Sequence, residues 1–222
     1  SAGRVQSVAV RLIVEKEREI QQFKSEANYR VTALFEVPES KTEIKAELSQ
    51  RFKTKEEAMA FLESCKQAAF RIDDIATRPQ KRTPSAPFTT STLQQEAAHK
   101  LGFTVAQTMM IAQKLYESGK ITYMRTDSVN LSSLCINACI QVITDSMGSQ
   151  YVKSRQFQTK SKGAQEAHEA IRPTYMDQTE IDGTPQEKRL YDLIWKRTIA
   201  SQMADAELEK TTVSIQSDKS QY

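Results

Sequence analysis

The sequence changes its pattern at one proline-containing basic segment, and this change limits what the chain can fold into. Residues 78–88 hold three prolines and three basic side chains, namely Pro79, Pro84, Pro87, Arg78, Lys81 and Arg82. Over residues 29–50, before this segment, apolar and polar residues alternate as they do in strands, whereas after it apolar residues recur at helical spacing. Because proline-rich polar segments form stiff connections, we interpret residues 78–88 as a linker between a β-rich part and a helical part.

The β-rich part begins with two alternating stretches. Tyr29 to Val37 and Thr42 to Gln50 carry apolar residues at alternate positions, and Pro38 to Lys41 supplies a turn between them. This pattern predicts a hairpin. The sequence Thr54-Lys55-Glu56-Glu57 has the form of a capping box and predicts the start of a helix. Residues 70–77 read as a further strand.

The second part of the chain is mainly helical. We expect helices over 93–101, 104–118, 131–147 and 184–206, with Gly102 and Gly119 at two of the helix ends. Ile121 to Arg125 reads as a short strand, so that helix, turn, helix and strand together resemble a winged-helix unit. A closing strand over 210–216 would return the chain to the β-rich part. We therefore predict an α+β fold in which a helical part is inserted between the strands of a scaffold.

The composition is that of a globular protein without a disulfide framework. The chain has 222 residues, a formal net charge of +3 and three cysteines, Cys65, Cys135 and Cys139. An odd number of cysteines without metal-ligand spacing favours a reducing, cytoplasmic setting. No run of eighteen apolar residues indicates a membrane span. The small positive charge neither requires nor excludes nucleic acid as a partner.

Tyr123 and Arg125 have the most suggestive chemistry of any pair in the chain. In a strand, residues two apart point to the same face. A phenol oxygen can attack a phosphorus atom, and a guanidinium can hold phosphate oxygens bidentately. The alternative is a packed strand tyrosine beside a surface arginine.

The first helix, over residues 4–23, also has two interpretations. The small residues Ser1, Ala2 and Gly3 precede it, and a helix start of this kind exposes N–H groups that suit a phosphate. The alternative is an ordinary amphipathic helix. The chain begins inside this pattern without an initiator methionine, so we expect a piece of a larger protein.

Polar side chains elsewhere leave similar alternatives. Ser91 and Thr92 fit either helix capping or contacts to DNA phosphates. Residues 151–165 carry four basic and no acidic side chains, and read as an exposed loop. His168 and Arg172 would stack at i, i+4 if their segment is helical. A metal site at His168 is disfavoured because no third ligand is evident nearby.

Three segments, in order, resemble the type IA DNA topoisomerases and specifically the bacterial enzymes. They are SAGRVQSVAVRLIVEKEREI at 1–20, ITYMRTDS at 121–128 and AQEAHEAIRPT at 164–174. The resemblance spans nearly the whole chain. It implies a β-rich arch domain that is interrupted by a mainly helical, winged-helix-like domain carrying the tyrosine.

The resemblance also implies roles for individual residues. The tyrosine that matches Tyr123 cuts one DNA strand through a 5′-phosphotyrosyl link and rejoins it without ATP. Arg125 would steady the phosphate charge, and His168 would lie near the scissile group. Together with the residues considered above, the expected DNA-binding set is Ser1, Ala2, Gly3, Arg4, Val5, Gln6, Ser91, Thr92, Arg125 and Arg172.

The expected domains follow from the same comparison. Residues 1–24 would be a helical segment of a neighbouring DNA-binding domain, 25–82 the first part of the arch, 83–208 the helical domain and 209–222 the return strand of the arch. The chain lacks the Asp-x-Asp-x-Glu cluster of a Toprim domain. We therefore expect no metal or cofactor in this chain, and Mg²⁺ in the full-length enzyme.

The expected partners are single-stranded DNA and the remaining domains of the same polypeptide, and no membrane is involved. We expect a monomer that is located in the cytoplasm and associated with the nucleoid. Negatively supercoiled duplex would be the substrate of the full enzyme, and the isolated fragment would be inactive. The alternatives are a winged-helix module that binds DNA without cutting it, and a structural adaptor with no nucleic-acid role.

Overall fold

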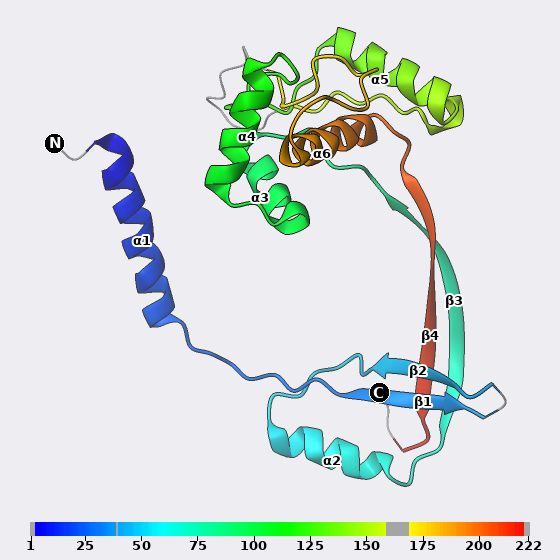
Figure 1. Cartoon of the computed structure of the whole chain (residues 1–222). Coiled ribbons are helices and arrows are strands. Elements are labelled where there is room, and N and C mark those ends of the chain that lie inside the picture. Colours follow the sequence, from blue (N-terminus) through cyan, green and yellow to red (C-terminus); the bar gives the residue numbers. More distant parts are fainter. Residues whose placement is uncertain (1–2, 39, 159–168, 220–222) are drawn as a thin grey trace. The chain divides into compact units, whose positions relative to one another are not determined.

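The computed structural model describes residues 3–38, 40–158 and 169–219. It is a mixed α and β structure, with six α-helices and two small two-stranded sheets in the described part of the chain (Figure 1). The chain forms two compact units, which we describe separately. The β-rich unit comprises Ser1–Thr77 and Thr211–Tyr222, and the helical unit comprises Arg78–Lys210. The helical unit is therefore inserted, in sequence, within the β-rich unit.

The β-rich unit confirms the predicted hairpin and the helix after it. Its first elements are α1 (Arg4–Gln22), β1 (Thr32–Val37), β2 (Thr42–Glu47) and α2 (Lys55–Cys65). Strands β1 and β2 pair antiparallel, with Phe35 opposite Ile44. Thr54 and Glu57 form the predicted capping box: the Thr54 hydroxyl accepts from the Glu57 N–H, and the Glu57 carboxylate accepts from the Thr54 N–H.

Two long strands, β3 (Phe70–Arg82) and β4 (Ala206–Ser217), pair with each other. The expected linker over 78–88 is wrong for its first five residues, which belong to β3. Pro79 lies within this strand. A proline cannot donate a ladder hydrogen bond, but β3 has a single partner strand, and its other edge requires no donor.

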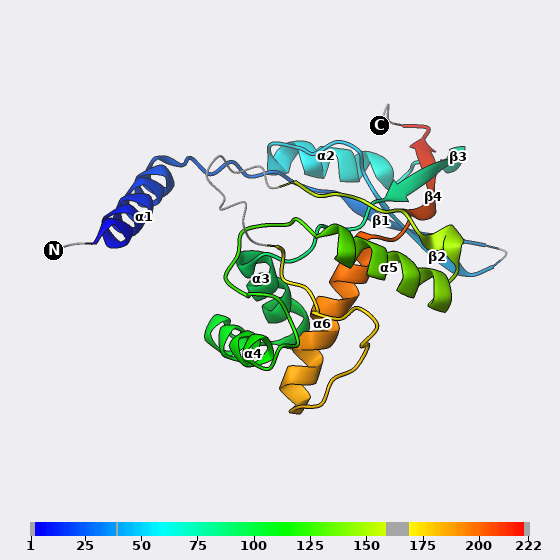
Figure 2. The same ribbon diagram turned by 90° about the horizontal axis from the view of Figure 1, so that it is seen from above.

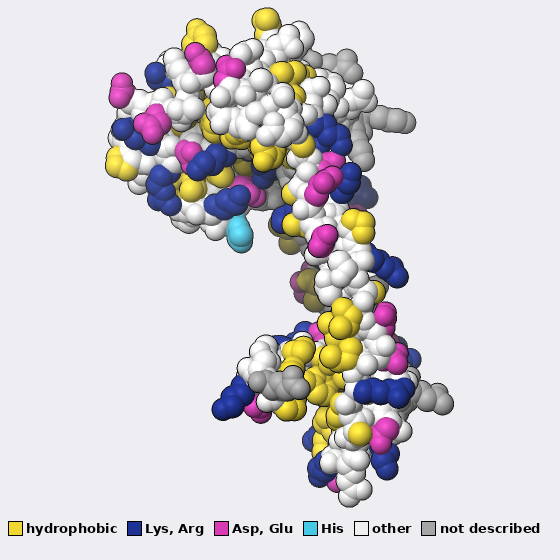
Figure 3. Space-filling view, turned by 90° about the vertical axis from the view of Figure 1, so that its right-hand side faces the viewer, with side chains coloured by type: hydrophobic (Ala, Val, Ile, Leu, Met, Phe, Trp, Pro, Cys, Tyr) yellow, Lys and Arg dark blue, Asp and Glu magenta, His cyan; other side chains and the backbone are white. Residues whose placement is uncertain are grey.

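The β-rich unit buries few side chains. Among its described residues only Phe52, Ala58 and Ser217 are buried. Figure 3 shows hydrophobic side chains on its surface, and the exposed residues include Leu34, Leu62, Phe70, Ile72 and Ile75. A cavity of about 490 Å³ lies between the hairpin, α2 and the paired long strands. The apolar face of α1 is likewise exposed, with Val5 82% and Ile13 68% accessible.

The helical unit holds the main core. Its elements are α3 (Thr90–Leu101), α4 (Val105–Glu117), α5 (Ser133–Ser146), a 3-10 turn η1 (Ser149–Tyr151) and α6 (Pro185–Ser201). Helices α3, α4 and α6 lie side by side in both ribbon views (Figures 1 and 2). One buried cluster, centred on Phe88, Leu93, Ile111, Leu190 and Ile194, fills the space between them.

A second buried cluster lies between α5 and α6. It contains Leu131, Cys135, Cys139, Ile143 and Ile199, and Trp195 packs against both clusters. Cys135 and Cys139 lie one turn apart in α5 and are both buried. The apolar face of α5 therefore faces the body of the unit.

Glycine ends the two helices at which the sequence places it. Gly102, after α3, has φ +71°, and Gly119, after α4, has φ +70°. These left-handed conformations cost a side-chain-bearing residue free energy that glycine does not pay. Thr89 and Thr104 cap the starts of α3 and α4, so the position of both helices follows from local sequence.

Three local expectations are wrong. Residues 121–125 do not form a strand; their one sheet-like contact is an isolated bridge between Ile121 and Pro173. Residues 169–174 are not helical. Arg155 does not lie in an exposed loop, because its guanidinium pairs with Asp205 at 2.6 Å and its side chain is only 15% exposed. In the described part of the chain, no helix is long and apolar enough to cross a membrane.

Candidate functional site around Tyr123

Tyr123 lies in an irregular segment, with bends at Thr122, Met124 and Arg125, that connects α4 to α5. Burial alternates along this segment: Met124, Thr126 and Ser128 are buried, whereas Tyr123 and Arg125 are exposed. Both candidate side chains are therefore accessible, and their position on a common face stays a prediction because the segment is not a strand. Burial alternates here without a partner strand, because the buried side of the segment packs against the helical core.

The Tyr123 ring packs against a second tyrosine. The ring centroids of Tyr116, in the last turn of α4, and Tyr123 are 5.3 Å apart at an interplanar angle of 67°. This edge-to-face contact is a favoured arrangement of two aromatic rings. Tyr123 remains 36% exposed, so it is held at the surface and not within the core.

The start of α3 holds one side of the segment. The Thr90 hydroxyl donates to the carbonyl oxygens of Met124 and Thr126, at 2.7 and 3.1 Å, and accepts from the Thr126 N–H at 2.9 Å. The Thr90 backbone N–H also donates to the Thr126 carbonyl at 2.9 Å. Thr90 is the first helical residue, where a backbone N–H has no partner within its own helix. The tyrosine segment supplies that partner.

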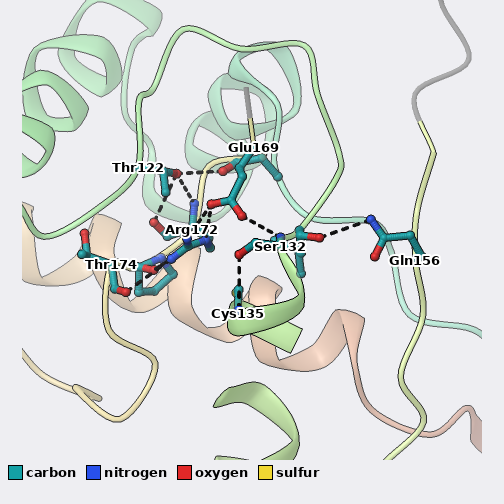
Figure 4. Close-up of polar contacts among 10 residues, drawn as sticks. Thr122, Ser132, Cys135, Gln156, Glu169, Arg172 and Thr174 are labelled. Atoms are coloured by element: carbon teal, nitrogen blue, oxygen red, sulfur yellow. Dashed lines mark hydrogen bonds and ion pairs between the residues drawn. The ribbon is translucent and has the colours of Figure 1, made fainter. Parts of the chain in front are cut away.

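Residues 169–174 hold the other side of the segment. The Thr122 N–H donates to the Arg172 carbonyl at 2.9 Å, and the Thr122 hydroxyl donates to the Ala170 carbonyl at 2.7 Å (Figure 4). The Thr174 N–H donates to the Lys120 carbonyl at 2.9 Å. The segment that contains the tyrosine and the end of the Ala164–Thr174 motif are therefore neighbours in the fold, although some fifty residues separate Thr122 from Arg172.

Glu169 and Arg172 form an ion pair beside this contact. The Glu169 carboxylate accepts from the Arg172 Nε at 2.8 Å and from the Ser132 N–H, ahead of α5, at 2.6 Å (Figure 4). Burial acts to raise the pKa of Glu169, but Ser132 and the Arg172 guanidinium outweigh it and leave that pKa below its ordinary value. The carboxylate is therefore charged at neutral pH and joins the 169–172 segment to the start of α5.

Arg172 is largely occupied by these contacts. Its Nη1 donates to the carbonyls of Pro173 and Thr174, at 2.8 and 3.3 Å, in addition to the Glu169 pair, and its side chain is 15% exposed. A contact between Arg172 and DNA would have to use the one guanidinium N–H that these bonds leave. Its expected DNA-binding role stays a prediction.

Several other expected site residues have defined positions. Thr92 completes a capping box with Thr89, and the Ser91 hydroxyl accepts from the Gln95 amide at 3.2 Å. Both hydroxyls are exposed at the start of α3. The capping interpretation is thus correct for Thr92, and contact with DNA stays a prediction for both. His99, for which we expect only a structural role, is exposed in the last turn of α3.

The expected N-terminal DNA-binding residues lie in or next to α1, in the other unit. Gly3 is the N-cap residue of α1, without a side-chain cap, and Val5 and Gln6 are exposed on the helix. Arg4 is the first residue of α1. Ser1, Ala2 and the candidate catalytic residue His168 lie outside the described residues.

Sequence reasoning missed two groups that hold the site together. Glu169 precedes Arg172 by three residues outside a helix, a spacing with no standard meaning. Thr122 looks like an ordinary β-branched residue beside the tyrosine. A weak signal exists for Thr90, because the four consecutive hydroxyl residues from Thr89 to Thr92 exceed what one cap requires. In the described ranges, no group of three His, Cys, Asp or Glu side chains comes together to bind a metal ion.

Comparison with known proteins shows the family of the chain. The DNA topoisomerase family model matches residues 1–222. DNA topoisomerase 1 of Pseudomonas aeruginosa is 47% identical over 224 residues, which cover 97% of this chain and 26% of that protein. DNA topoisomerase 1 of Zymomonas mobilis subsp. mobilis is 46% identical over 226 residues, covering 97% of this chain and 18% of that protein.

A solved structure shows the same similarity in three dimensions. The full-length topoisomerase I from Thermotoga maritima superposes with a TM-score of 0.74 at 35% identity, over 100% of this chain and 37% of that one. The chain therefore spans well under half the length of each of these relatives. With a match along its entire length, the chain belongs to the DNA topoisomerase family.

Proposed function

We propose that this chain is the part of a type IA topoisomerase that supplies the DNA-cleaving tyrosine. The observation that carries the proposal is the contact between the Tyr123 segment and residues 169–174, since two motifs far apart in sequence build one surface. Tyr123 is exposed on that surface and backed by a buried segment. A nucleophile needs this combination of access and fixed position.

The proposed reaction is a transesterification. The Tyr123 Oη attacks the phosphorus of a phosphodiester in single-stranded DNA and loses its proton. A bond forms between Oη and phosphorus, the bond from phosphorus to the 3′ oxygen breaks, and that oxygen takes up a proton. The product is a 5′-phosphotyrosyl link and a free 3′ hydroxyl. The reverse attack reseals the strand without ATP, because the link conserves the energy of the original ester.

Other residues have supporting roles in this proposal. Arg125, which is exposed as Tyr123 is, binds phosphate oxygens as their charge develops. His168 orients groups near the scissile phosphate. The residues from Ser1 to Gln6, together with Ser91, Thr92 and Arg172, contact the DNA backbone. We also propose that α3 and α4 are the two helices of a winged-helix-like arrangement, although residues 121–125 form no strand.

The activity of the whole protein is also part of the proposal. In a longer, monomeric enzyme of the cytoplasm, nicking and resealing would relax negatively supercoiled DNA. The described residues bring no three candidate ligands together, so we assign the Mg²⁺ site to a different domain of that enzyme and derive no step through the metal.

The test uses a full-length enzyme that contains this chain. Tyr123→Phe removes one oxygen and little packing area, so it should abolish plasmid relaxation and leave the affinity for single-stranded DNA unchanged within about twofold. Binding by both proteins with relaxation by neither would favour the alternative, a DNA-binding module that does not cut. Relaxation by the Tyr123→Phe variant at the rate of the unmodified enzyme would refute the assignment.

A further inference from the structure

We propose that Thr90 and Thr122 are positioning residues, whose hydroxyl groups hold the tyrosine segment from both sides and fix where Tyr123 and Arg125 stand. This inference rests on the proposed function, because it concerns the alignment of the same nucleophile. Neither threonine need touch DNA. Each acts through the backbone that carries the reacting side chains.

Thr90 holds the segment after Tyr123. Its hydroxyl makes three contacts with Met124 and Thr126, and its backbone N–H makes a fourth. Met124 is 1% exposed and Thr126 8%, so water has little access to this stretch of backbone. Buried backbone groups require partners, and Thr90 provides them for the two residues that flank Arg125.

Thr122 holds the segment before Tyr123. Its hydroxyl donates to the Ala170 carbonyl at 2.7 Å and accepts from the Arg172 N–H at 3.0 Å. Its own backbone N–H donates to the Arg172 carbonyl. The Glu169–Arg172 pair fixes this second strip of chain from its far side. Tyr123 therefore lies between two anchored residues, Thr122 and Met124.

The hydrogen bonds of Thr90 and Thr122 distinguish a positioning role for their hydroxyl groups from a role in contacting DNA. The Thr90 hydroxyl has one proton, which the carbonyls of Met124 and Thr126 share, and it already accepts from the Thr126 N–H. No proton is left for a phosphate oxygen. The same holds for Thr122, whose proton goes to the Ala170 carbonyl. By contrast, the exposed Ser91 hydroxyl accepts from the Gln95 amide and can donate its proton to a phosphate oxygen, whereas the Thr92 hydroxyl donates to the Thr89 carbonyl at 3.3 Å.

Thr→Val replaces the hydroxyl with a methyl group of similar shape. With a donor and an acceptor lost, the segment should shift, and a misplacement of about 1 Å at a reacting group costs on the order of 100-fold in rate. We therefore expect Thr90→Val and Thr122→Val to lower the single-turnover rate of oligonucleotide cleavage by roughly 10- to 100-fold in the full-length enzyme.

The controls separate positioning from general loss of stability. Thr90→Ser and Thr122→Ser keep the hydroxyl, and should cleave within about threefold of the unmodified enzyme. Thr198→Val removes a buried hydroxyl that donates within α6, to the Ile194 carbonyl at 2.9 Å. It should lower Tm as the other valine variants do, yet leave the cleavage rate unchanged. The affinity for single-stranded DNA should stay within about twofold for every variant.

Three results would overturn the inference. One is cleavage at the unmodified rate by both folded variants at 90 and 122, while Tyr123→Phe is inactive; the proposed function would then stand without these positioning residues. Another is a loss of cleavage in the serine variants as large as in the valine variants. The serine variants keep the test informative if Thr→Val prevents folding. The third is equal loss in Thr198→Val. Cleavage by the Tyr123→Phe variant would instead refute the proposed function itself.

Discussion

Tyr123 is an exposed side chain on an otherwise well-anchored backbone. Its neighbours Thr122 and Met124 are tied to different parts of the helical unit, and its ring rests on Tyr116. An exposed tyrosine on a mobile loop would spend little time in any one attacking geometry. Because the backbone is held in place, the spacing of Tyr123 and Arg125 can position both side chains for a reaction.

The Glu169–Arg172 pair is expected to stabilise the site. Glu169→Gln keeps the shape but removes the charge that binds Arg172 and the Ser132 N–H, so it should lower the free energy of unfolding by about 1–2 kcal/mol at pH 7. Glu63→Gln is the matched control, because Glu63 pairs with Lys66 on the surface, with both side chains about two-thirds exposed. That change should cost little. Thermal unfolding of the three proteins measures both effects.

The same pair predicts a pH dependence. The pKa of Glu169 is lowered in the folded state, so its contribution is fully present above the pKa of an unfolded glutamate, about 4.3. The contribution is lost as the pH falls through the lowered folded pKa. The difference in Tm between the unmodified chain and Glu169→Gln should therefore be constant near neutrality and shrink in acid. A difference that grows as the pH falls would contradict the assignment.

The helices show how far local sequence can predict this fold. Caps at Thr54 and Thr184 place the starts of α2 and α6 where the sequence indicates, and a glycine at 102 ends α3. The start of α3 lies three residues before the predicted Leu93, because Thr89 is its N-cap. The strand expected over 121–125 fails for a different reason. The alternation of buried and exposed residues in this segment comes from packing on the helical core and not from pairing with another strand. The sequence alone does not distinguish these two causes.

The strands predicted over 70–77 and 210–216 are confirmed, but their extension into β3 and β4 and the contacts at the site could not be predicted. Pro79 is tolerated in β3 because that strand has one partner, which only the fold reveals. The bonds from Thr90 to Thr126 and from Thr122 to Arg172 join residues 36 and 50 positions apart. Local patterns predict elements, whereas pairing between distant segments depends on the assembled core.

A substitution at Gly102 tests whether glycine is what ends α3. Its φ of +71° lies in the left-handed region, and an added Cβ would meet nothing within 4 Å. Gly102→Ala should therefore destabilise the helical unit by about 1 kcal/mol through backbone strain alone. Gly3→Ala is the control, because Gly3 also has open space but a φ of −60°. If Gly102→Ala leaves Tm unchanged, glycine is not what ends α3.

At the scale of the whole molecule, the two units differ in how they are stabilised. The helical unit has two buried clusters, whereas the described part of the β-rich unit buries three side chains and leaves the apolar face of α1 exposed. The chain also covers only 18–26% of the two bacterial relatives compared above. Surface of this kind suits contact with further domains of a longer enzyme.

The chain alone should therefore bind but not relax DNA. We expect it to fold through its helical core, to bind single-stranded DNA weakly, and to leave negatively supercoiled plasmid unrelaxed with or without Mg²⁺, because the proposed metal site and much of the enzyme are absent. Gel electrophoresis beside a full-length enzyme measures this. Relaxation by the chain that disappears in its Tyr123→Phe variant would show that no further domain is needed.

Tyr123 is the residue that we propose becomes linked to DNA. The direct measurement traps cleaved oligonucleotide on a full-length enzyme that contains this chain, digests the protein and identifies the modified peptide by mass spectrometry. We predict a nucleotide joined through its 5′ phosphate to Tyr123. A nucleotide on its neighbour Tyr116, whose ring lies 5.3 Å away, or on any other residue would contradict the account.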